Sequence, residues 1–237
     1  NNLVAIGLVV GLDYENPYLS PFHEMQRLKT HKAIRPLFEG GRRISYGARA
    51  LNEGGYQSIP KLTFPGGALI GCGAGFMNVP KVKGTHTAMK SAMLAAEAAA
   101  DAIKASQAET DYDQRLRDSW VYEELYGVRN IRPSFQRGLY YGMAYSAFDT
   151  YVMRGKASWT KRHEHADHEF LTKAQDAQPI EYPKPDNELT FDRLSSVFLS
   201  NTNHAENQPC HLVLKDADVA IQHNYKLYDS PESRYCP

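Results

Sequence analysis

The sequence predicts an α/β (α+β) fold in which short strands alternate with helices. Residues 3–10, LVAIGLVV, form an apolar run with the length and composition of a buried strand. Residues 21–30 place Phe22, Met25 and Leu28 at helical spacing, with polar side chains between them. Residues 65–103 combine a short apolar strand, a glycine-rich loop and a long helix. The rest of the chain is arranged around this third stretch.

The stretch 65–103 has the order strand, glycine loop, helix. Ala68-Leu69-Ile70 predicts a short buried strand, and Gly71, Gly73 and Gly75 allow positive φ angles or a close approach to a ligand. Thr85 can cap the helix that follows. One helical stripe is apolar, whereas Lys90, Glu97 and Lys104 lie off it. The residues of that stripe are Met89, Met93, Ala96, Ala100 and Ile103.

This order is typical of nucleotide and flavin sites, because free N–H groups converge at the start of the helix. The glycines do not follow the dinucleotide fingerprint, since Phe76 and Asn78 stand where its third glycine belongs. A tight turn in front of a packing helix is the alternative interpretation, and the residues alone leave both open.

Further elements are predicted from local patterns. Residues 43–50 follow Gly40-Gly41 and read as a strand, and residues 52–55 read as a turn. Asn52 in this turn is either a turn former or an amide donor to a cofactor carbonyl. A polar helix is predicted over 111–126, and a proline-rich extended segment over 179–185. Short strands of a small separate unit are predicted at 189–199, 210–214 and 219–227.

Composition narrows the class of protein. The 237 residues are enough for a sizeable core, and 27 basic residues balance 27 acidic ones, so nothing favours nucleic acid. Three irregularly placed cysteines argue against a disulfide framework and suit a reducing compartment. No signal peptide is evident, and no apolar run approaches the ~18 residues of a membrane span. The opening strand has no preceding element, so we expect a fragment of a longer protein.

Residues 135–153 are unusually aromatic. Two interpretations stay open, a helix lying in the lipid headgroup layer and an ordinary amphipathic core helix. Trp159 follows the segment and cations flank it. The apolar residues are Phe135, Leu139, Tyr140, Tyr141, Met143, Tyr145, Phe148, Tyr151, Val152 and Met153, and the cations are Arg129, Arg132, Arg137, Arg154, Lys156, Lys161 and Arg162.

Two groups of residues invite a metal interpretation. His163, His165 and His168 have no nearby cysteine, so a solvated linker is favoured over a zinc site. His23 and His31 are read as helix-surface groups for the same reason. Cys236 is followed by proline, a pair familiar from iron–sulfur ligation, but a 4Fe–4S cluster needs three more thiolates.

Several long strings resemble electron transfer flavoprotein–ubiquinone oxidoreductases. They are LIGCGAGFMNVPKVKGTHTAMKSAMLAAE, the upstream GLVVGLDYENPYLSPFHEMQRLKTHKAIRPLFEGGRRISYGARALNEGGYQSIPKL, and the downstream VRNIRPSF, PIEYPKPD, LSSVFLSNTNHAENQP and YDSPESRYCP. The resemblance covers nearly the whole chain. It implies a C-terminal portion that lacks the N-terminal FAD-binding motif and the C-x-x-C-x-x-C run of the iron–sulfur domain.

The resemblance implies a fold and its parts. The fold is the C-terminal part of a glutathione-reductase-like FAD domain, with a quinone-binding domain and a truncated ferredoxin-like iron–sulfur domain. Residues 1–60 belong to the quinone-binding domain and the return to the FAD domain, and 61–110 to the FAD-contacting strand, glycine loop and helix. Residues 111–165 form a helical membrane-surface and quinone region, and 166–237 the truncated 4Fe–4S domain.

The resemblance also implies function. Electrons pass from reduced electron transfer flavoprotein through FAD and a 4Fe–4S cluster to ubiquinone, and no residue acts as general acid, base or nucleophile. The enzyme is monotopic, on the matrix side of the mitochondrial inner membrane or on a bacterial cytoplasmic membrane. Cys236 is a cluster ligand, although neither a cluster nor activity is expected in this chain alone. The flavin-contacting residues are Asn52, Gly71, Gly73, Gly75, Gly84, Thr85 and His86.

Two other functions are kept as alternatives. A nitrogen-fixation-type flavoprotein dehydrogenase would share the flavin segment but lack the cluster domain, against which the string YDSPESRYCP argues. A non-enzymatic membrane-surface module would use only the aromatic and basic residues.

Overall fold

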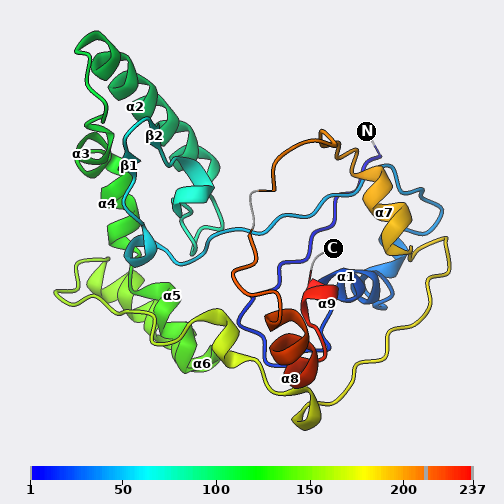
Figure 1. The fold of residues 1–237 in the computed structure, drawn as a ribbon. Helices are drawn as coiled ribbons and strands as arrows, with labels where there is room; N and C mark the ends of the chain where they lie inside the picture. Colours follow the sequence, from blue (N-terminus) through cyan, green and yellow to red (C-terminus); the bar gives the residue numbers. More distant parts are fainter. Residues whose placement is uncertain (1, 211–212, 236–237) are drawn as a thin grey trace. The chain divides into compact units, whose positions relative to one another are not determined.

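The computed structural model describes residues 2–210 and 213–235. The chain forms two compact units, one of Asn1–Arg49 with His165–Pro237 and the other of Ala50–Glu164 (Figure 1). The regular secondary structure of the described residues is mostly helical, with one small two-stranded sheet. The predicted mixture of strands and helices is therefore confirmed only in part.

The unit of Ala50–Glu164 has its core between three helices. In Figure 1, α2 runs beside α3 and α4. Helix α2 spans Thr85–Lys104, α3 spans Tyr112–Arg117 and α4 spans Trp120–Gly127. Burying a large apolar side chain stabilises a fold by ~1.5–3 kcal/mol. The buried cluster consists of Leu62, Ala74, Phe76, Leu94, Ala98, Tyr112, Leu116, Val121 and Leu125.

A short hairpin and a tight loop lead into α2. Strands β1 (Thr63–Phe64) and β2 (Gly67–Ala68) pair antiparallel, with Thr63 opposite Ala68. The predicted strand at 68–70 is thus present only at its first residue. Residues 69–70 are irregular, and the chain leaves the extended conformation at Gly71, whose φ of +63° no strand residue adopts; a 3₁₀ turn, Gly71–Ala74, follows. A second 3₁₀ turn, Tyr56–Ser58, lies ahead of β1.

The long helix is confirmed, but its core-facing stripe is not the apolar one. Thr87, Ser91, Leu94, Ala98 and Ala102 are buried on α2. The predicted stripe of Met89, Met93, Ala96, Ala100 and Ile103 is exposed. Small side chains face inward because the glycine loop lies against the helix, where a Cβ added at Gly71 would be 3.4 Å from that of Ala88.

The aromatic segment is helical. A short helix, α5 (Ile131–Ser134), continues through a 3₁₀ turn, Phe135–Arg137, into α6 (Leu139–Ala147). The last part, Phe148–Met153, widens to a π-helix. Among the described residues, none of the helices is long and apolar enough to cross a membrane.

The other unit begins with the predicted N-terminal helix. Helix α1 spans Pro21–Lys29, and the Ser20 side chain accepts from the N–H of His23 at its start. Serine at the N-cap with proline at the first helical position is a strong start signal, which is why this element was predictable. The other helices of the unit are α7 (Arg193–Leu199), α8 (Lys226–Tyr228) and α9 (Glu232–Tyr235). Its 3₁₀ turns are Arg35–Leu37, Asp167–Phe170 and Ala174–Asp176, and Val219–Tyr225 is a π-helix.

The strands predicted for this unit are wrong. Segments 3–10 and 43–50 are irregular, and no strand lies beside either of them among the residues described. Side chains fix the second segment instead: Arg43 stacks on Phe191 at 3.9 Å and donates to the Ser196 hydroxyl at 2.6 Å. Residues 189–199 and 219–227 contain helices, the first begun by the Asp192 carboxylate accepting from the N–H of Ser195. Of the strand predicted at 210–214, residues 211–212 lie outside the described part and the others are irregular.

Candidate functional site

The glycine loop is anchored on the inner face of α2. The N–H of Gly71 donates to the Ser91 hydroxyl at 3.0 Å, and that hydroxyl donates to the carbonyl of Ala88. The Thr87 hydroxyl contacts the carbonyl of Phe76 at 2.5 Å, just past the loop. Both hydroxyls are buried, and a buried polar group must find a partner. Sequence reasoning missed Thr87 and Ser91, because they lie on a face of α2 other than the stripe that the sequence predicted to be buried.

Asn52 holds the loop from the other side. Its amide nitrogen donates to the carbonyls of Cys72 and Gly73, each at 3.2 Å. The predicted site residues Asn52, Gly71, Gly73 and Gly75 therefore lie together. Gly75 ends the turn in the left-handed region, with φ +86°. The Asn52 amide therefore positions the loop, since it already bonds two loop carbonyls. Its contact with a flavin carbonyl stays a prediction.

The start of α2 has no side-chain cap. Gly84 occupies the N-cap position, and Thr85 is the first helical residue. Thr85 as a cap is therefore wrong; the Thr87 hydroxyl donates to the Gly84 carbonyl instead, at 2.9 Å. Ala88 makes the first intrahelical bond, which leaves the N–H groups of Thr85, His86 and Thr87 without an intrahelical acceptor. Partial positive charge collects there and favours an anion or a carbonyl oxygen.

A carboxylate network stands beside this helix start. One oxygen of Glu124, Oε1, accepts from Asn78 at 2.8 Å and from Lys81 at 3.1 Å, and it lies 2.9 Å from His86 Nε2. His86 also stacks on Trp120, with ring centroids 5.7 Å apart and planes 9° apart. Burial raises the pKa of Glu124, but the bonds from His86, Asn78 and Lys81 outweigh it and hold the pKa below its usual value.

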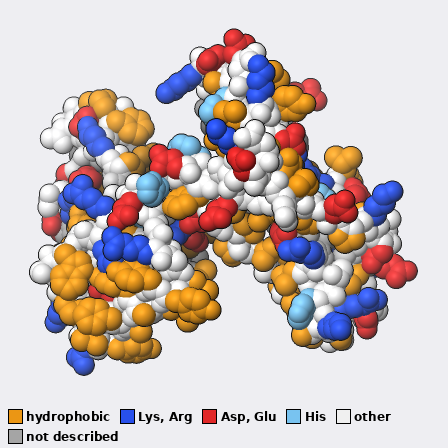
Figure 2. Space-filling view, turned by 90° about the horizontal axis from the view of Figure 1, so that it is seen from below, with side chains coloured by type: hydrophobic (Ala, Val, Ile, Leu, Met, Phe, Trp, Pro, Cys, Tyr) orange, Lys and Arg blue, Asp and Glu red, His pale blue; other side chains and the backbone are white. Residues whose placement is uncertain are grey.

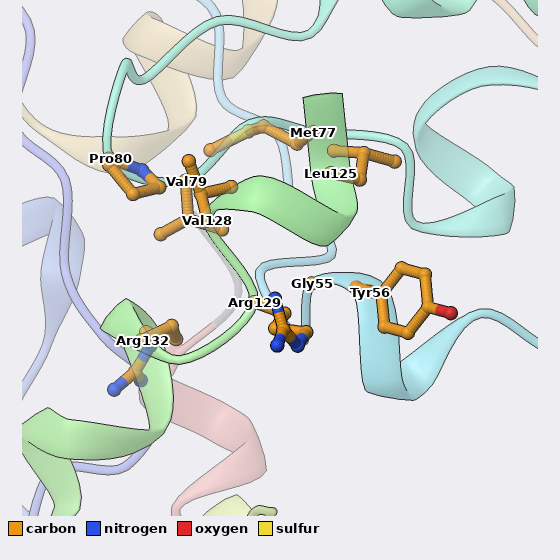
Figure 3. Close-up of a pocket in the computed structure, with 9 residues that line it drawn as sticks. All are labelled: Gly55, Tyr56, Met77, Val79, Pro80, Leu125, Val128, Arg129 and Arg132. Atoms are coloured by element: carbon orange, nitrogen blue, oxygen red, sulfur yellow. The ribbon is translucent and has the colours of Figure 1, made fainter. Parts of the chain in front are cut away.

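A small apolar cavity lies between the end of the loop and α4. Figure 3 shows Met77, Val79 and Val128 close together, with the hydroxyl of Tyr56 pointing away from them. The room for a water-sized molecule inside it is only about 10 Å³. Small-molecule sites usually hold ~300–1,000 Å³, so this cavity does not accommodate a flavin or quinone ring by itself. Its lining is Gly55, Tyr56, Met77, Val79, Pro80, Leu125, Val128, Arg129 and Arg132.

The aromatic segment presents its large side chains outward. Tyr140 is 86% exposed and Tyr151 79%, which disagrees with an ordinary core helix. In Figure 2, hydrophobic side chains gather on the side where α5 and α6 lie in Figure 1, with Lys and Arg beside them. The exposed set consists of Leu139, Tyr140, Tyr141, Met143, Phe148, Tyr151, Val152 and Trp159.

A buried arginine fixes the end of this segment. Arg129 is 2% exposed, and its guanidinium donates to the carbonyls of Ala157 and Trp159 while stacking on Tyr126 at 3.6 Å. Asp149 is 1% exposed, and its Oδ1 has no hydrogen-bond partner. Burial raises the pKa of Asp149, and the nearby positive charges oppose this only in part.

Two of the histidines for which the sequence favours a solvated linker have individual partners, and the predicted cluster ligand Cys236 lies outside the described residues. In the described part of the chain, no group of three or more His, Cys, Asp or Glu side chains could hold a metal ion. His163 lies 2.7 Å from the carbonyl of Gly54, and His165 lies 3.2 Å from Glu169. Cys72 is half-buried in the glycine loop and Cys210 is exposed. With three cysteines in all, this chain cannot supply the four thiolates of a 4Fe–4S cluster.

Comparisons with known proteins define the class. Residues 1–51 match a family model described as "ETF-QO, ubiquinone-binding", and residues 187–237 match one described as "Electron transfer flavoprotein-ubiquinone oxidoreductase, 4Fe-4S". Both family models describe parts of one class of protein, the first its ubiquinone-binding part and the second its 4Fe-4S part. The mitochondrial electron transfer flavoprotein-ubiquinone oxidoreductase of Homo sapiens is 57% identical over 245 residues, which cover 99% of this chain and 40% of the human protein.

Proteins of the same name from a plant and from Dictyostelium match the chain over a similar span. The protein of that name from Arabidopsis thaliana is 56% identical over 99% of this chain and 37% of its own length. The Dictyostelium discoideum protein is 49% identical over 100% of this chain and 42% of its own length. The chain belongs to the electron transfer flavoprotein–ubiquinone oxidoreductase family. It spans about two fifths of the length of the curated relatives it matches.

Proposed function

We propose that this chain is part of an enzyme that passes electrons from reduced electron transfer flavoprotein, through FAD and a 4Fe–4S cluster, to ubiquinone. One observation carries the proposal: a quinone-binding and a 4Fe–4S family model match the two ends of a chain that is 57% identical to a named oxidoreductase over 99% of its length. The remainder of the machinery then comes from sequence that the relatives have beyond this span.

The flavin site is proposed at the glycine loop and the start of α2. The uncapped N–H groups of Thr85 and His86 fit the carbonyl-bearing edge of a flavin, which gains negative charge on reduction. Gly73 leaves the loop open, because a Cβ there would meet nothing within 4 Å. FAD supplies the redox chemistry when bound. The chain's own residues orient its edge and stabilise charge there, and Asn52 keeps the loop in register.

Cys236 is proposed as one cluster ligand. The match to the 4Fe–4S family model covers it, and the family resemblance implies that the other three thiolates belong to a C-x-x-C-x-x-C run. The proposed domain boundaries stay those of 1–60, 61–110, 111–165 and 166–237. The cysteines of this chain do not by themselves provide a complete set of cluster ligands. We therefore propose that the isolated chain is inactive.

The exposed aromatic segment is proposed to lie in the membrane interface. Its tyrosines and Trp159 are flanked by Arg137 and Lys161, both of which lie over the ring of Tyr141. Aromatic rings with cations at their edge suit the headgroup layer, where ubiquinone is reached from the bilayer. Relatives are named mitochondrial, so we propose the mitochondrial inner membrane or, in a bacterium, the cytoplasmic membrane.

The test uses the full-length holoprotein that carries this sequence. It should show flavin absorbance and an iron–sulfur signal, and it should reduce a ubiquinone analogue when supplied with reduced electron transfer flavoprotein. Absence of a cluster would favour a nitrogen-fixation-type dehydrogenase, and absence of a flavin would favour a membrane-surface module. Replacing Thr85 with Ala removes the side-chain hydroxyl at the helix start, which we propose as a second donor to the reduced flavin, and should lower the flavin midpoint potential, because a hydrogen bond to a charged state contributes about 1.5–3 kcal/mol. Replacing Asn52 with Ala should lower it too, because the glycine loop loses the amide that holds its carbonyls in place. Unmoved midpoints in both variants would remove the proposed flavin site.

A further inference from the structure

We infer that Glu124 is a positioning residue for the flavin site: it ties the turn at 78–83 and His86 to α4, and it places a negative charge beside the first N–H groups of α2. The inference rests on the proposed function, in which those N–H groups face the flavin. Glu124 need not touch the cofactor, because it acts through the groups that it holds.

The first tie fixes the turn that leads into α2. Asn78 is fully buried and donates its amide to Glu124 at 2.8 Å. The turn is closed by a backbone bridge in which Asn78 N–H donates to the Lys83 carbonyl at 2.9 Å. Gly84, the N-cap, is the next residue. Holding Asn78 therefore sets where the helix begins.

The second tie fixes the first turn of the helix. His86 is the second residue of α2, and it meets Glu124 through Nε2 and Trp120 through its ring face. Trp120 and Glu124 are four residues apart on α4, so they lie on the same face of that helix. Two contacts from one face prevent α2 from rotating about its axis at this end.

The carboxylate also sets the local charge. The positive end of the α2 dipole attracts negative charge arriving on a reduced flavin, and a fixed carboxylate nearby opposes that attraction. Lys81 neutralises only part of the Glu124 charge, since the Lys81 side chain is largely exposed and solvent screens the ion pair. Removing the Glu124 charge should therefore raise the flavin midpoint potential.

Three variants separate position from charge. Glu124→Gln keeps an oxygen acceptor for Asn78 but removes the charge, whereas Glu124→Ala removes both. The control is Glu123→Gln, the same change at the adjacent residue, which is exposed on α4. All three are made in the full-length holoprotein, with Thr85→Ala beside them as a probe of the flavin edge.

Hydrogen exchange and redox titration are the two readouts. Glu124→Ala should speed amide exchange over residues 78–88 at least several-fold, whereas the control should leave it unchanged. Glu124→Gln should raise the flavin midpoint relative to the control. Two outcomes would overturn the inference and leave the proposed flavin site standing. One is amide exchange in Glu124→Ala at the native rate. The other is a flavin midpoint in Glu124→Gln equal to that of the control, while the midpoint of Thr85→Ala is lowered. Midpoints unmoved in every variant would overturn the proposed flavin site, and the charge effect with it.

Discussion

At the scale of single residues, several polar side chains that contact one another in the folded structure lie far apart in the sequence. Glu124 meets Asn78 and His86 across 46 and 38 positions of sequence. No local pattern predicts such a contact, because periodicity reports on neighbours within a helix or strand. The glycine-rich turn and the helix after it were predictable, because glycine permits backbone conformations that other residues rarely adopt. The hydroxyls of Thr87 and Ser91 were not recognised, because a polar residue is normally assigned to the exposed face.

Asp149 gives a pH-dependent prediction. Burial raises its pKa in the folded chain above the unfolded value, so the stabilisation is complete below the unfolded pKa and is lost as pH rises through the folded one. Asp149→Asn removes this ionisation. We expect its melting temperature to exceed that of the native protein by more at pH 7 than at pH 4.

Thermal denaturation at the two pH values measures this difference. Asp167→Asn, an exposed residue, is the matched control and should show the same difference from native at both. A variant that is less stable than native at pH 7 would mean that the ionised Asp149 is a favourable partner of the buried Arg129.

At the scale of elements, helices were predicted better than strands. Helix α1 carries Ser20 and Pro21 at its start, and these act locally. An apolar run such as 3–10 becomes a strand only if another strand supplies hydrogen bonds, and none does so in the part of the chain that the structure describes. The helical stripe of α2 was misjudged because alanine-rich helices have several faces of similar polarity. The buried face of α2 is the one with the smallest side chains where the helix packs against the glycine loop.

Neighbouring residues on α2 test that assignment. Leu94 is 9% exposed and belongs to the core, whereas Met93 is 55% exposed. Leu94→Ala should lower the free energy of unfolding by about 2–5 kcal/mol, because it leaves a cavity. Met93→Ala should change it by no more than about 0.5 kcal/mol. Urea denaturation of both variants decides the matter, and equal losses would place the methionine stripe in the core.

At the scale of the whole molecule, family membership was predictable from the sequence and the pairing of distant segments was not. Within the unit of Asn1–Arg49 and His165–Pro237, Tyr182 donates to Glu24 at 2.8 Å, and the N–H of Phe191 donates to Gln26 at 3.0 Å. These contacts join segments about 160 residues apart. Long idiosyncratic strings identify a relative, but they carry no information on which segments meet.

The membrane interface is the prediction that concerns the molecule as a whole. Tyr140, Tyr141 and Phe148 are exposed on the aromatic segment, and replacing all three with Ser should release the full-length protein from liposomes. Apolar burial contributes ~25 cal/mol per Å², so losing three aromatic rings weakens binding by on the order of several kcal/mol. Co-sedimentation with vesicles that contain anionic lipid measures the bound fraction.

A control must separate this segment from exposed apolar surface in general. Leu194, Phe198 and Tyr225 are exposed in the other unit, and their triple replacement with Ser removes comparable apolar area without touching the aromatic segment. That variant should bind vesicles as the native protein does. If instead both triple variants kept native binding, with circular dichroism unchanged, the aromatic segment would not be the anchor. Raised salt should weaken the native binding only in part, because the flanking cations are screened over about 8–10 Å whereas ring burial is not.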